Sequence, residues 1–136
     1  MEVGYAYLFL GDTARARTLL NRHLLLNPDP DDFYYMDLGL ISFVEGDLEK
    51  AANYLELIAN PDIWALLYRA ITAKAGGFPF QMKVGAFRNR LSMIWPPEAP
   101  MTPDAVVAWV ASHHPFQSQE TEARFLAAVR NIVIEV

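Results

Sequence analysis

The sequence predicts an all-α fold: a right-handed superhelix of antiparallel helix pairs that ends in C-terminal capping helices. Apolar residues recur at helical spacing along the chain, and glycine, proline and aspartate separate the apolar stretches at short intervals. Only the final IVIEV resembles a strand, and we assign it to the end of a helix. With 136 residues, of which 53% are apolar, the chain is long enough to form one domain with a substantial core.

Two stretches of the chain repeat each other at a spacing of 35 residues. The matched residues are Gly4 and Gly39, Gly11 and Gly46, Asp12 and Asp47, Ala16 and Ala51, and Leu20 and Leu55. The second glycine of each set suits the left-handed residue after a helix, the aspartate caps the next helix, and the alanine lets two helices approach. A period of about 34 residues built from two short helices is the signature of the tetratricopeptide repeat, an α-solenoid.

The expected helices follow from this repeat. They cover residues 1–10, 13–26, 33–45, 48–59, 63–75 and a sixth stretch that ends at about Trp95. They form three units at about 1–28, 32–61 and 62–96. The first helix begins at Met1 without a capping residue, which suggests a piece cut from a longer protein. The third unit is degenerate, because its hairpin is longer and Val84 or Gly85 stands where the small alanine is expected.

Two further helices are expected after a proline-rich break at residues 96–100. Thr102 is a capping residue and Pro103 occupies the first helical position, so a helix runs from there to about Ser112. A last helix spans about 118–134. These helices make residues 101–136 the C-terminal cap of the array.

Residues 33–130 resemble the C-terminal tetratricopeptide region of bacterial signalling proteins that carry a class III nucleotide cyclase or winged-helix regulator domain. The similar segments are GDLEKA, NPDIWALLYRA and HPFQSQETEARFLAAVR. The resemblance implies a closing cap that includes Pro115, Phe116, Phe125, Leu126 and Arg130. It also implies a non-catalytic interaction or scaffold module in a larger bacterial protein. The cyclase and winged-helix residues themselves are not in this sequence.

The charge and residue content exclude several classes of function. The formal net charge is −5 and the basic residues are scattered, so we expect no nucleic-acid binding. Cysteine is absent, which excludes disulfides and thiolate metal sites and favours a reducing, cytoplasmic location. The uncharged run over residues 3–11 is too short to cross a bilayer, so we expect no membrane partner.

The candidate groups for chemistry do not assemble into a catalytic or metal site, so we expect neither an enzyme nor a cofactor. The adjacent His113 and His114 diverge on a helix, and we interpret them as a solvated helix end. The segment with Asp29, Asp31 and Asp32 lacks the glycine and the distal glutamate of a calcium loop and is expected to cap a helix. Glu45, Glu49 and Glu56 are expected on the surface without a paired partner in a pocket, which argues against a general acid–base role.

The inner groove of the array is the candidate binding surface. In tetratricopeptide arrays, the first helix of each pair lines this groove. The corresponding residues are Met1, Tyr5, Leu8, Phe9, Phe33, Met36, Leu40, Phe43 and Val44, with Arg69 and Thr72 in the third unit. Nearly all are apolar, and such a surface does not stay in water.

Two explanations of the apolar groove remain open. The chain's own later helices, an upstream repeat or a second copy could cover it, or an amphipathic segment of a protein or peptide partner could dock there. We therefore expect an interaction module that binds a partner or forms a homodimer. The alternative is a stand-alone chaperone of the type III secretion class that holds an amphipathic segment.

Overall fold

The computed structural model describes Leu8, Phe9 and residues 11–134, and the regular structure of these residues is entirely α-helical. The helices are α2 (Thr13–Leu26), α3 (Asp32–Glu45), α4 (Leu48–Glu56), α5 (Ile63–Gly76), α6 (Gln81–Ile94), α7 (Pro103–Ser112) and α8 (Gln119–Ile134). The predicted all-α class is therefore confirmed for the described part of the chain. Most of the helix expected at 1–10 lies outside it, as do Met1, Gly4 and Tyr5.

Side-chain caps set where the helices begin. Each of four aspartates accepts a hydrogen bond from the backbone N–H three residues later: Asp12 from Arg15, Asp31 from Tyr34, Asp47 from Lys50 and Asp62 from Ala65. Thr102 caps α7 in the same way. At the other end, Gly46 follows α3 with a φ of 87°, a left-handed conformation that glycine adopts without strain. The caps predicted at Asp12, Asp47 and Thr102 are confirmed.

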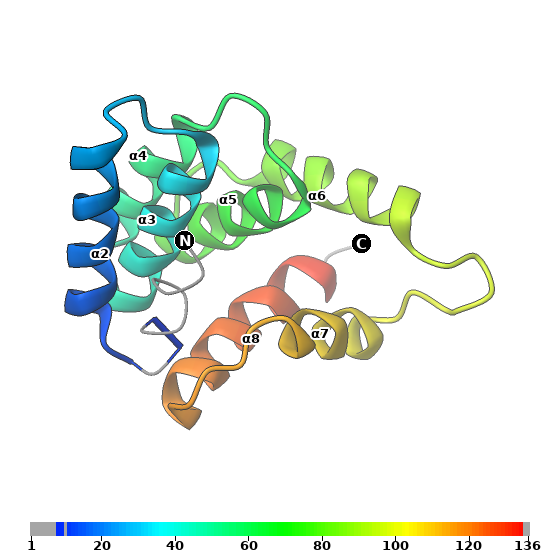
Figure 1. Cartoon of the computed structure of the whole chain (residues 1–136). Coiled ribbons are helices and arrows are strands. Elements are labelled where there is room, and N and C mark those ends of the chain that lie inside the picture. Colours follow the sequence, from blue (N-terminus) through cyan, green and yellow to red (C-terminus); the bar gives the residue numbers. More distant parts are fainter. Residues whose placement is uncertain (1–7, 10, 135–136) are drawn as a thin grey trace.

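Helices α2 to α6 follow one another in a row (Figure 1). In this row α2 packs against α3, α3 against α4, α4 against α5 and α5 against α6, and α3 also contacts α5. The connection between α3 and α4 is only Gly46 and Asp47, so these two helices form a tight antiparallel hairpin. The alanines and leucines matched between the two units, at 16, 51, 20 and 55, are at most 1% exposed and fill the seams of this row.

The last two helices do not extend the row. The linker Trp95–Thr102 leaves the end of α6, projects away from the body and returns to α7 (Figure 1). Helix α7 packs against α8, and α8 packs against α5 rather than continuing outward from α6. The α7–α8 hairpin thus folds back across one face of the row.

The close approach of α3 and α4 requires Gly39. A Cβ atom at this position would lie 2.5 Å from Leu55 Cδ2 and 2.6 Å from Leu55 Cγ, both in the seam. Gly85 in α6 offers a matched contrast, because a Cβ atom there would meet nothing within 4 Å.

We predict opposite effects for alanine at these two glycines. Gly39→Ala should destabilise the fold by about 1–3 kcal/mol, because Leu55 must move out of a packed seam. Gly85→Ala should stabilise it by about 0.5–1 kcal/mol, because alanine is the better helix former where space is open. Urea unfolding followed by circular dichroism measures both changes. Equal effects at the two positions would contradict the packing described for α3 and α4.

Candidate functional site

The candidate site is one face of α3 and α5, called here the inner face, and the hairpin covers part of it. On α3 it consists of the predicted groove residues Phe33, Met36, Leu40, Phe43 and Val44. On α5 it consists of Trp64, Tyr68, Ile71 and Ala75, which share one side of the helix at spacings of three and four residues. Both stripes lie on helices that the repeat expects to line the groove, but the stripe on α5 does not include the expected Arg69 and Thr72.

Most of the predicted groove residues are core in this structure. Leu8 is 1% exposed, Met36 6%, Leu40 0% and Phe43 4%, so none of them presents an open apolar surface. Phe9 and Val44 are half-buried, and Tyr5 lies outside the described residues. For Phe43 and Val44 the physical reason is that α8 of the same chain lies on this face, so one of the chain's own later helices covers part of it.

Helix α8 is seated on the inner face by Phe125. This ring is 1% exposed and lies with its centroid 6.2 Å from that of Phe43, edge to face. Val129 and Ile132, which follow at spacings of four and three, are fully buried on the same side. Each of these apolar side chains contributes roughly 1.5–3 kcal/mol by leaving water. The inner face therefore already holds an apolar helix.

Two cationic side chains stabilise the packing of α8 on the inner face by binding backbone carbonyls at helix ends. Arg124 of α8 donates to the carbonyl of Val44 in the last turn of α3. Lys74 of α5 donates through Nζ to the carbonyl of Asn131 in the last turn of α8, at 3.1 Å. Such carbonyls have no partner inside their own helix and carry partial negative charge, so both bonds are favourable. A groove of about 580 Å³ remains beside α8, with Ile71, Ala75 and Ala127 among its lining residues.

His114 lies at the centre of the contact between the hairpin and α5. It is 3% exposed, and its Nδ1 lies 2.8 Å from the carbonyl oxygen of Val110, to which it must donate. Its Nε2 lies 2.7 Å from the hydroxyl of Tyr68 and therefore accepts that proton. Burial lowers the pKa of His114 to about 4, an effect that the nearby His113 adds to and the Val110 bond opposes.

The expected solvated helix end is thus wrong for His114, although His113 is exposed. The signal that could have revealed it is periodicity: Val106, Val110 and His114 lie four residues apart and continue one buried stripe of α7. The proline after His114 suggests a helix end, but not that the end is solvated.

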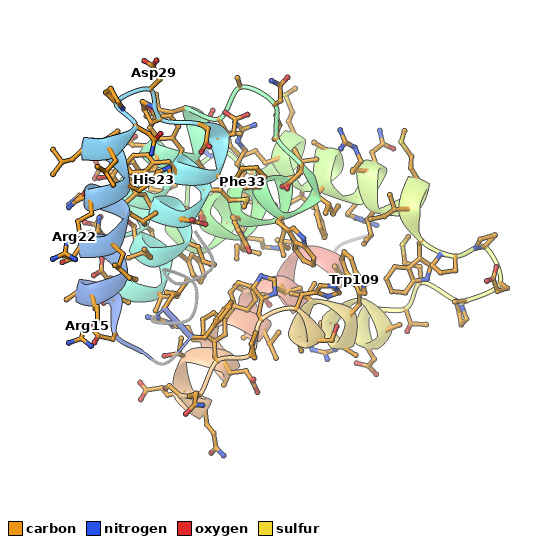
Figure 2. The ribbon with its side chains drawn as sticks, in the orientation of Figure 1. Arg15, Arg22, His23, Asp29, Phe33 and Trp109 are labelled. Carbon is orange, nitrogen blue, oxygen red and sulfur yellow. The ribbon has the colours of Figure 1, made fainter. Side chains whose placement is uncertain are left out.

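Aromatic rings complete the attachment of the hairpin to the row. Trp64 of α5 and Trp109 of α7 stack with centroids 4.8 Å apart, and Trp95 meets Trp109 edge to face at 6.0 Å. These are the chain's three tryptophans. Phe9 packs against Phe116 at 5.0 Å, so the N-terminal segment also contacts the loop before α8. Figure 2 shows Trp109 on α7.

Arg69 has a structural position, although the repeat pattern placed it in the groove. Its Nε and Nη2 donate to the carbonyl of Leu55, at 3.0 and 2.8 Å, and Nη2 also donates to the carbonyl of Ile58, at 2.9 Å. The guanidinium therefore caps the C-terminal end of α4 instead of facing a partner. The second polar position, Thr72, is 1% exposed.

The start of α3 is the open part of the inner face. Phe33 is 57% exposed there (Figure 2), beside a small pocket of about 130 Å³. Its lining residues are Asp32, Phe33, Met36, Ile58, Asn60, Asp62 and Ala65. Asp32 accepts the backbone N–H groups of Ala59 and Asn60, and these bonds lower the pKa of its carboxyl. The pocket is thus apolar inside and has two carboxylates at its rim.

Other candidate groups are engaged in structural contacts. Glu45 pairs with Arg17 at 2.6 Å and Glu56 with Lys83 at 3.1 Å, so each of these carboxylates joins two helices through an ion pair. Across the described residues, no group of three or more metal-binding side chains could hold an ion, and no helix is long and apolar enough to span a bilayer.

The buried His114 predicts a pH dependence of stability. Its pKa is about 4 when folded and about 6.5 when unfolded, so between these values the unfolded chain binds more protons. Stability should therefore be full above pH 6.5 and should fall by about 2 kcal/mol between pH 7 and pH 5. Urea unfolding at a series of pH values measures the fall. In His114→Gln, which keeps an acceptor for Tyr68, most of this dependence should disappear; an unchanged slope would contradict the assignment.

We compared the sequence with protein-family models and with curated proteins, and the structure with solved structures. None of the three comparisons finds a match. A functional assignment therefore depends on the residues and contacts described above.

Proposed function

We propose that the chain is a non-catalytic helical-repeat module of the tetratricopeptide type that binds a protein or peptide partner. The 35-residue spacing of matched glycines, aspartates and alanines supports the repeat. So do the successive contacts of α2 to α6 and the additional contact between α3 and α5. In this proposal the module belongs to a larger bacterial signalling or regulatory protein, and the absence of cysteine fits a cytoplasmic location.

The observation that carries the proposal is that the inner face already binds a helix. Phe125 packs against Phe43, and Arg124 and Lys74 each bond a carbonyl at a helix end. A surface that accommodates an apolar helix in this way has the chemistry by which helix-in-groove recognition works. The proposed site for a partner is the open part at the start of α3.

The open part indicates the chemistry of the partner. Phe33 offers an exposed ring beside an apolar pocket, and the carboxylates of Asp32 and Asp62 stand at its rim. An apolar side chain flanked by lysine or arginine suits this combination, because it fills the pocket while its charge meets the carboxylates. The partner segment is therefore expected to be apolar and basic.

The chaperone alternative fits less well. A chaperone that holds a long amphipathic segment needs an open groove along both α3 and α5. With α8 packed on this face, Leu40 and Phe43 are at most 4% exposed, and the open parts are the Phe33 end and the groove beside α8. We therefore favour an interaction module with a short binding site.

We predict that peptides selected from a random library on the immobilised chain will contain an apolar residue next to lysine or arginine. Phe33→Glu should weaken their binding at least tenfold, about 1.4 kcal/mol, because it removes the ring on which the apolar residue packs and places a charge in the apolar contact. Fluorescence anisotropy of a labelled peptide measures the affinity.

Met82→Glu is the matched control. Met82 is 90% exposed and lies at the start of α6, beyond the C-terminal end of α5, whereas the pocket lies at the start of α5. Both substitutions should leave the unfolding midpoint nearly unchanged, because both side chains are largely exposed. Equal binding by the two variants would overturn the site, and selection of acidic peptides would overturn the proposed partner chemistry.

A further inference from the structure

We infer that the α7–α8 hairpin exchanges between two copies of the chain, so that each inner face is closed by the partner copy's α8. The hairpin is a distinct unit: α7 packs on α8, and α8 docks on α5 and, through Phe125, on α3. Among the described helices, α6 makes no comparable contact with α7 or α8, although it directly precedes them in the chain. The covalent connection between row and hairpin is the linker Trp95–Thr102.

The linker is rich in proline. It contains prolines at 96, 97 and 100, which fix their own backbone and favour extended conformations in the residues before them. Two of its hydrogen bonds close a turn within the linker: Ala99 N–H donates to the carbonyl of Pro96, and Trp95 Nε1–H donates to the carbonyl of Ala99, each at 3.1 Å. Figure 1 shows that the linker projects from the body of the molecule. Opening it would break this turn and the contact of Trp95 with Trp109.

The docking contacts are the same whichever chain supplies the hairpin. Phe125 against Phe43, His114 against Tyr68 and Trp109 against Trp64 all join a hairpin residue to a residue of the row. A second copy can therefore make every one of them with equal geometry. The balance between the closed monomer and the exchanged dimer then depends on chain concentration and on the linker.

The ends of the linker supply an interaction that is available only in the dimer. Met93 is 77% exposed, Ile94 50% and Met101 45%, which places three apolar side chains in water around one loop. In an exchanged dimer the two linkers pass each other near the two-fold axis, where these side chains can meet their copies. Burying them favours association, because apolar area leaves water.

This inference goes beyond the proposed function and does not depend on it. It concerns the covered part of the inner face, whereas the proposed partner site is the open part around Phe33. Phe33→Glu should therefore leave the fraction of dimer unchanged even though it weakens peptide binding at least tenfold.

The test uses a cysteine pair, since the natural chain contains none. Ala75 of α5 and Ala127 of α8 line the same groove, so Ala75→Cys with Ala127→Cys places two thiols across the docking contact. The full-length variant is refolded at low and at high chain concentration, and monomer and dimer are separated by size. A short bismaleimide then bridges the thiols, and mass spectrometry under denaturing conditions shows which chains are joined.

Exchange predicts that the dimer grows with concentration and that its bridges join two chains, while bridges in the monomer lie within one chain. A dimer whose bridges lie within single chains would overturn the inference, because it would associate without exchange. A monomer at all concentrations would also overturn it. Replacing Pro96, Pro97 and Pro100 by glycine should lower the dimer fraction several-fold, because a flexible linker closes more easily on its own chain.

Discussion

The packing of Phe125 joins the two parts of the molecule. Its ring meets Phe43 of α3 at 6.2 Å, His114 at 4.8 Å and Phe116 at 5.3 Å, so one side chain connects the row, the hairpin turn and α8. Without it, Phe43 and the neighbouring inner-face residues would be exposed to water, and His114 would lose the apolar surroundings that keep it neutral. The division of the inner face into a covered part and an open part follows from where this ring sits.

Polar groups make that packing specific. His114 can occupy the apolar contact because Tyr68 and the Val110 carbonyl satisfy both of its ring nitrogens. Arg124 and Lys74 fix the position of α8 along the inner face by binding backbone carbonyls, whose places do not change with sequence. His114 and the two cations thus define one position of α8 along the inner face. Apolar contacts alone would allow α8 to shift along this face.

Features that depend on residues close together in the sequence, such as the helix caps, were predicted correctly. Asp12, Asp47 and Thr102 cap the expected helices because an N-cap needs only the next three residues. The path of the hairpin was not predictable, because the sequence of the linker does not determine whether α7 packs against α6 or folds back over the row of helices. Arg69 was placed in the groove by its repeat position, but its long side chain reaches the end of α4 instead. His114 was misjudged for the same reason: its partner Tyr68 is 46 residues away in the chain.

Hydrogen exchange of the full-length chain tests most directly whether α8 is an integral part of the inner face. The amides of α8 around Phe125 and Val129 should exchange as slowly as those of α3 around Leu40, because both become exposed only when the whole domain unfolds. Phe125→Ala should raise the exchange rates of both helices together. Rapid exchange in α8 while α3 remains protected would contradict the account, since it would mean that the inner face stays folded without its helix.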